Sequence, residues 1–157
     1  MTRLISGRVA ELGYALEAAS APAANYVPFV LEGNLLYISG QISRKGGKPQ
    51  YLGQLGNQIS DADGVEAAKL SGLGILSQIA AATGDRLDRV ARVVRLGVFV
   101  ASTPDFNRQS AVANGASDLM VDVFGDAGRH SRSAVGVASL PQGVAVEVEA
   151  VIALTPA

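Results

Sequence analysis

The sequence contains no cysteine and only one histidine among its 157 residues. The absence of cysteine excludes disulfide bonds, thiolate nucleophiles and cysteine-based metal sites. Aromatic residues make up only 5% of the chain and charged residues 17%, whereas 48% of it is hydrophobic. Disordered chains have the opposite composition, so we expect a folded protein.

No stretch of the chain is strongly basic, and the formal net charge is −1. Binding of phosphate backbones needs a basic surface, so nucleic acid is not an expected partner. No apolar run approaches the roughly 20 residues of a membrane-spanning helix. Glu11 and Glu17 also interrupt the only candidate signal peptide. These absences predict a cytoplasmic protein without a membrane partner.

The length suits one hydrophobic core, and residues 1–157 are predicted to form a single domain. A chain with so few charges exposes more apolar surface than one subunit easily hides. Contact with further copies of the chain would bury that surface. We therefore expect a homo-oligomer.

Hydrophobic periodicity in the first half predicts a short amphipathic helix over residues 2–12, an extension of the domain. Two strands, residues 26–32 and 35–42, flank a Gly33-Asn34 turn that is typical of a tight hairpin. Residues 43–64 are rich in glycine and are expected to form a long exposed loop. Such a loop could border a functional site.

The second half carries two long helical patterns. Residues 65–83 have alanine, leucine and isoleucine at spacings of three and four, which predicts a largely buried helix. A second helix is expected to begin at Ser102 or Thr103 as its cap, with Pro104 in its first turn, and to end near Phe124.

Three further strands are expected over residues 90–100, 131–138 and 144–154, the last two joined by a turn at residues 140–143. The resulting β-β-α-β-α-β-β order predicts an α+β domain in which two long helices cover one face of a mixed sheet. The other face also needs a cover. A trimer built around a central barrel of sheets would provide it.

Few side chains look catalytic from their spacing. We interpret His130, which lies beside Arg129 and Arg132, as a surface or hydrogen-bonding residue rather than a catalytic base. The glycines form no dinucleotide-binding or P-loop pattern, and no metal-ligand cluster is found. We therefore expect no metal and no organic cofactor.

The C-terminal part gives a stronger signal. Arg132 stands at the start of one predicted strand, and Glu147 and Glu149 occupy alternate positions of the next. Alternation by two places both acids on the same face of their strand. From this pattern alone, the acids are either solvated or paired with Arg92 or Arg95 on a neighbouring strand.

Two segments resemble the signature regions of the YjgF/RidA family: GNLLYISGQ at residues 33–41, and RSAVGVASLPQGVAVEVE at residues 132–149. They occur in the family's order, and the similarity covers residues 26–154. The resemblance implies a chorismate-mutase-like fold, assembled as a homotrimer with clefts at the subunit interfaces. It also implies cofactor-free hydrolysis of enamine or imine intermediates, such as 2-aminoacrylate, to 2-keto acids and ammonia.

The same resemblance implies roles for individual residues. Arg132 matches the arginine that grips the substrate carboxylate, and Glu147 matches the glutamate that positions or activates water. Tyr26 matches a pocket tyrosine. Ser39 and Gly40 match a hydroxyl and a backbone N–H that face the ligand, although Ser39 could equally form a local bond at the end of its strand.

Three further pocket positions are implied, and two of them differ from the family's deaminases. Ser110 stands where those have an asparagine, with Asn114 one helical turn later, and Ala134 stands where many members have a cysteine. NGAS at residues 114–117 and GRHSR at residues 128–132 resemble a less characterised subgroup.

These differences leave three functions open. The first is the enamine or imine deaminase. The second is a protein of the same fold that binds a small carboxylate or keto acid without turnover. The third is the endoribonuclease or translation inhibitor, a label often given to this family, which the acidic balance and the single histidine disfavour.

Overall fold

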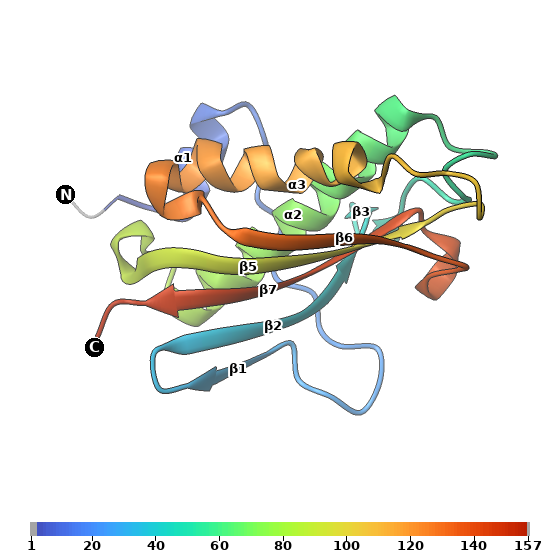
Figure 1. Cartoon of the computed structure of the whole chain (residues 1–157). Coiled ribbons are helices and arrows are strands. Elements are labelled where there is room, and N and C mark those ends of the chain that lie inside the picture. The colour runs from blue at the N-terminus through green and yellow to red at the C-terminus, as the bar shows by residue number, and fades with distance from the viewer. Residues whose placement is uncertain (1–2, 157) are drawn as a thin grey trace.

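Two long helices form one layer of the structure, and a five-stranded sheet forms the other (Figure 1). The computed structural model describes residues 3–156. In chain order the elements are α1 (Ile5–Glu11), β1 (Phe29–Glu32), β2 (Leu35–Ile42), β3 (Arg44–Lys45), β4 (Lys48–Pro49), α2 (Asp61–Thr83), η1 (Leu87–Arg89), β5 (Val90–Ala101), α3 (Gln109–Phe124), η2 (Gly125–Gly128), β6 (Ser131–Val137), η3 (Pro141–Gly143) and β7 (Val146–Leu154). The predicted α+β class and the order of the main elements are confirmed.

The sheet has the strand order β1-β2-β7-β5-β6. β5 and β6 are parallel and are connected through α3, whereas every other neighbouring pair is antiparallel. The segment at η3 joins β6 to β7, but β5 lies between these two strands in the sheet. The predicted turn is therefore a crossover at the end of β5 and not the tip of a hairpin.

The strand β7 shows why the sheet has one buried face. Its even positions are buried, Val148 and Ile152 completely, whereas Glu147 and Glu149 on the odd positions are not. The buried positions of β7 pack beneath α2, and α3 lies beside α2 on that face and covers β5 and β6 (Figure 1). The opposite face leaves several large apolar side chains exposed: Val30, Leu35, Tyr37, Val94 and Val135. This is the face for which the sequence predicts cover by other copies.

The prediction of one long exposed loop over residues 43–64 is wrong. β3 and β4 form a short hairpin there, and Leu55 is fully buried in the core. The helix α2 begins at Asp61 instead of residue 65, because the hydroxyl of Ser60 accepts a hydrogen bond from the backbone N–H of Asp63 at 3.1 Å and caps it. Its predicted end is confirmed at Gly84, where φ is +65°.

The prediction that Ser102 or Thr103 caps the second helix is also wrong, since α3 begins at Gln109. The backbone N–H of Ser102 donates to Val137 and that of Thr103 donates to Leu55, both at 3.0 Å. These bonds hold the chain extended beyond β5, so it cannot turn into a helix at Pro104. The hydroxyl of Ser102 donates back to the Val100 carbonyl at 3.1 Å.

The segment between α1 and β1 runs from the helical layer to the edge of the sheet (Figure 1). α1 lies within the predicted residues 2–12, of which Thr2 is outside the described part of the chain. Between residues 3 and 156, no helix is both long and apolar enough to cross a membrane. The connecting segment and the β3–β4 hairpin border a large cavity.

Candidate functional site

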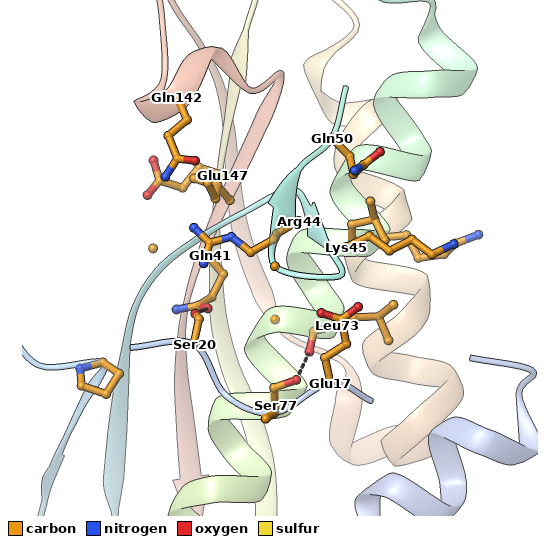
Figure 2. A pocket seen from close by; sticks show the side chains of 18 of the residues that line it. Glu17, Ser20, Gln41, Arg44, Lys45, Gln50, Leu73, Ser77, Gln142 and Glu147 are labelled. Atoms are coloured by element: carbon orange, nitrogen blue, oxygen red, sulfur yellow. Dashed lines mark hydrogen bonds between the residues drawn. The ribbon is translucent and has the colours of Figure 1, made fainter. Parts of the chain in front are cut away.

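A cavity of about 960 Å³ lies where the end of β2, the β3–β4 hairpin, α2, η3 and the segment after α1 meet. Its volume is at the upper end of the range for small-molecule sites, about 300–1,000 Å³. Figure 2 shows polar side chains from several of these elements around it. The polar and charged side chains in its lining are Tyr14, Glu17, Ser20, Tyr26, Gln41, Arg44, Lys45, Gln50, Tyr51, Glu66, Lys69, Ser77, Gln142 and Glu147.

Glu147 reaches this cavity from β7 because a glycine lies beside it on β2. A Cβ atom at Gly40 would collide with Glu147 Oε1, so only glycine leaves room for the carboxylate. The pairing of β2 with β7 shifts register between Ile38 and Gln41, next to this contact. Gly97 on β5 makes room in the same way for Glu149, whose Oε1 would lie 2.8 Å from a Cβ at that position.

The environment of Glu147 raises the pKa of its carboxyl above the ordinary value, first because the group is half-buried and second because Glu149 is negatively charged nearby. Neither acid forms an ion pair within 4.0 Å in the described part of the chain. The alternative that they pair with Arg92 or Arg95 is therefore not found. A carboxylate with a raised pKa and no cationic partner is suited to accept a proton.

Replacement of Glu147 by glutamine is expected to stabilise the protein at alkaline pH. Below 4.5, the ordinary pKa of this group, Glu147 is protonated in both the folded and the unfolded chain and makes no difference to stability. As pH rises through the raised pKa, ionisation costs more in the folded state, and the free energy of unfolding falls. Glu147→Gln lacks this loss. Urea denaturation at a series of pH values measures it.

The expected pattern is an advantage for Glu147→Gln at pH 8 that disappears below the ordinary pKa of glutamate. Glu149→Gln provides the matched comparison, because it removes the neighbouring negative charge but leaves Glu147 able to ionise. A difference between wild type and Glu147→Gln that stays constant with pH would rule out ionisation as its cause.

The structure separates two other residues that the resemblance implies, Tyr26 and Ser39. Tyr26 lines the cavity together with Gly40 and Glu147. Ser39 does not line it, and its hydroxyl donates to the Val27 carbonyl at 2.8 Å. Of the two roles considered for Ser39, the structure therefore has the local hydrogen bond.

Arg132 lies elsewhere, on the edge strand β6, where α3 holds its guanidinium. Nη1 donates to Asn114 Oδ1 at 2.9 Å and to Ser117 Oγ at 3.0 Å, and Nη2 donates to the hydroxyl and the carbonyl of Ser110 at 2.8 and 3.1 Å. All four acceptors are uncharged, and no carboxylate of residues 3–156 lies within 4.0 Å of Arg132. These hydrogen bonds fix the direction of the guanidinium, but no anion of the described residues compensates its positive charge. Ala134 follows two residues later on the same strand and packs against the core.

His130 extends this cluster. Its Nδ1 lies 2.6 Å from the Gly128 carbonyl, which can only accept, so Nδ1 carries the proton. Its Nε2 lies 2.9 Å from the hydroxyl of Ser117, which also accepts from Arg132. The ring therefore supports Ser117, and through it Arg132, as expected for a hydrogen-bonding histidine.

A single chain does not bring Arg132 and Glu147 together. Arg132 pairs with Leu96 on β5, and Leu96 pairs with Ala150 on β7, three residues along from Glu147. This register separates the two residues by about 10 Å across the sheet and about 10 Å along it. Arg132 also contacts α3, whereas Glu147 is on the sheet face that the helices do not cover. Any site containing both needs groups from two chains.

The sequence predictions did not single out Arg44, Gln41 or Gln142 as site residues, although all three line the cavity. Gln41 ends the signature segment at residues 33–41, and Arg44 is the second residue of the segment 43–64 that was predicted as a loop bordering a site. These two positions were the available signals. The position of Arg44 depends on the β3–β4 hairpin, which contacts α2.

Comparisons with known proteins agree with this fold. Residues 6–149 match the family described as "YjgF/chorismate_mutase-like, putative endoribonuclease". Protein TCP17 of Trypanosoma cruzi is 52% identical over 159 residues, covering 98% of this chain and 99% of TCP17. The crystal structure of Atu1372 from Agrobacterium tumefaciens, a protein of unknown function, is 45% identical and covers 96% of this chain and 92% of its own, with a TM-score of 0.90. E. coli TdcF, solved with bound serine, shares the fold at 24% identity and a TM-score of 0.63, covering 87% of this chain and 94% of TdcF.

Proposed function

Because this chain belongs to the YjgF/chorismate-mutase-like family, we propose that it hydrolyses the imine or enamine form of a 2-amino acid to a 2-keto acid and ammonia. The observation that carries this proposal is the state of the Glu147 carboxyl. This group faces the cavity, its pKa is raised, and no cation of residues 3–156 lies within 4.0 Å of it. The bound serine in TdcF supports a small amino-acid-like ligand for this fold.

The proposed site lies between two copies of the chain. One copy contributes the cavity with Glu147, Gly40 and Tyr26, and a second copy contributes Arg132 from its edge strand β6. The apolar side chains on the uncovered face of the sheet support an assembly that buries this face, for which we propose a trimer. Clefts between copies would then be equivalent.

Arg132 binds the substrate carboxylate in this proposal. A carboxylate accepts from a guanidinium more strongly than a hydroxyl or an amide does, so it can replace the exposed Ser110 and Asn114 as partner. Ser117 and His130 keep the guanidinium in place from the other side. Ser110 and Ala134 thus form part of the wall rather than the reacting groups.

Glu147 acts as the general base. The substrate reacts as the protonated imine, which an enamine becomes by gaining a proton from solvent on its β-carbon. Glu147 takes a proton from a water molecule as the water oxygen attacks the carbon of the C=N bond, which gives a neutral carbinolamine. The protonated Glu147 then gives this proton to the nitrogen, and the C–N bond breaks as the C=O bond forms. Ammonia leaves, and the hydroxyl proton passes to the Glu147 carboxylate and from there to solvent.

The test generates an imino acid in situ with an amino-acid oxidase and follows the appearance of the 2-keto acid with and without this protein. Acceleration above the spontaneous rate by wild type is expected. A rate equal to the spontaneous one, together with calorimetric binding of the 2-keto acid, would favour the alternative of a carboxylate-binding protein without turnover. This alternative is favoured by the observation that the Arg132 guanidinium already donates hydrogen bonds to Asn114 and Ser110.

Gly40→Ala is expected to lower this hydrolysis about 100-fold, because the added methyl group displaces the Glu147 carboxylate. Gly97→Ala is the matched control, since it crowds Glu149 on the same sheet face and leaves Glu147 in place. Rates of keto-acid formation by the two variants measure the effect. Equal losses in both would mean that general damage to the sheet, not the position of Glu147, is responsible.

A further inference from the structure

We propose that Arg44 binds a second carboxylate on the ligand's side chain, so that the cavity selects dicarboxylic imino or keto acids over monocarboxylic ones. This inference rests on the proposed function, in which Arg132 of a second copy binds the first carboxylate. It starts from the position of Arg44 on β3, in the wall of the cavity that also contains Glu147. In Figure 2, Arg44 extends from the hairpin toward the part of the cavity that Glu147 and Gln41 border.

Among residues 3–156, the guanidinium of Arg44 has neither an ion-pair nor a hydrogen-bond partner. Its Nε is buried and makes no hydrogen bond, and no carboxylate of the described residues lies within 4.0 Å of it. A buried donor on a charged group without an acceptor is costly. An anion in the cavity would balance the charge of this guanidinium by accepting from its terminal nitrogens, which Glu147, more than 4.0 Å away, does not do.

The other charged groups of the cavity have different surroundings. Lys69 pairs with Glu66 at 3.0 Å, and the carboxylate of Glu17 accepts from the backbone N–H of Gly46 at 2.7 Å. Lys45 points away from Arg44 (Figure 2). Arg44 is therefore the cation directed to the Glu147 side of the cavity.

The size and polarity of the cavity indicate a ligand longer than a three-carbon imino acid. A volume of about 960 Å³ leaves room for a side chain beyond the reacting carbon. The amides of Gln41 and Gln142 line the same space and can hydrogen-bond an extended polar ligand. Glu147 lines the same cavity, and its negative charge disfavours a doubly charged phosphate more than a singly charged carboxylate as the partner for Arg44.

Calorimetry with 2-ketoglutarate and 2-ketobutyrate tests this inference on the wild-type assembly, on Arg44→Gln and on Lys48→Gln. Lys48 is the control because it is exposed on the same hairpin and does not line the cavity. We expect wild type and Lys48→Gln to bind 2-ketoglutarate about 10- to 100-fold more tightly than 2-ketobutyrate. Arg44→Gln is expected to lose this preference and to keep its affinity for 2-ketobutyrate. Arg44→Lys is expected to retain part of the preference.

Two results would overturn the inference: a wild type that does not prefer the dicarboxylate, or an Arg44→Gln variant that loses both ligands equally. The second result would assign Arg44 to the first carboxylate or to folding. Binding is measured without turnover, so the outcome is separate from that of the proposed function. A protein that selects 2-ketoglutarate through Arg44 but hydrolyses no imine would retain this inference and refute the hydrolysis.

Discussion

Glu147→Gln is expected to lower imine hydrolysis about 100- to 10,000-fold, the usual contribution of a general base. Glutamine has the shape of glutamate but cannot take a proton from water. The contact with Gly40 and the place in the cavity are retained, so affinity for the 2-keto acid should change little. The oxidase-coupled assay at saturating substrate measures the rate, and calorimetry measures the affinity.

Glu149→Gln is the matched control for this prediction. It removes the neighbouring negative charge that helps to raise the pKa of Glu147, so it should make Glu147 a weaker base. The expected loss is below about tenfold, because the proton acceptor is still present. If both variants lose activity to the same degree, the pair of acids acts together and Glu147 has no special role. If neither loses activity, the base is elsewhere.

Mixing two inactive variants is expected to restore activity. Arg132→Ala should lower hydrolysis about 100-fold through loss of the carboxylate contact. When Arg132→Ala and Glu147→Gln chains are refolded together in equal amounts, some interfaces receive an intact Arg132 from one chain and an intact Glu147 from the other. Random assembly should restore about one quarter of the wild-type activity. The rate of the refolded mixture is compared with that of each variant refolded alone.

The control for this experiment is Arg132→Ala mixed with the Arg132→Ala/Glu147→Gln double variant, which can form no intact site. Activity confined to the first mixture would support a site shared between chains. A first mixture as inactive as its control would contradict the shared site, because the register of the sheet keeps Arg132 and Glu147 apart within one chain.

The sequence by itself determined the element types and their order. The hydrophobic spacing of residues 65–83 and the alternation in residues 144–154 have periods of a helix and a strand, and these periods depend only on neighbouring residues. Alternation also places Glu147 and Glu149 on one face, as observed. The burial of Leu55 within residues 43–64 and the late start of α3 have one cause. Backbone hydrogen bonds join Leu55 to Ala101 and to Thr103, and such distant pairings have no local signal.

Only the tertiary structure decided which functional groups share a space. The resemblance implied that Arg132 and Glu147 serve one ligand in a cleft between subunits. Within one chain, the strand order puts β5 between their strands and the pleat puts them on opposite faces. The fold also made Arg44 a cavity residue, because the β3–β4 hairpin bends it toward the site. Spacing along a chain fixes the face of a strand, but register and strand order fix its neighbours, and these arise from packing of the whole sheet.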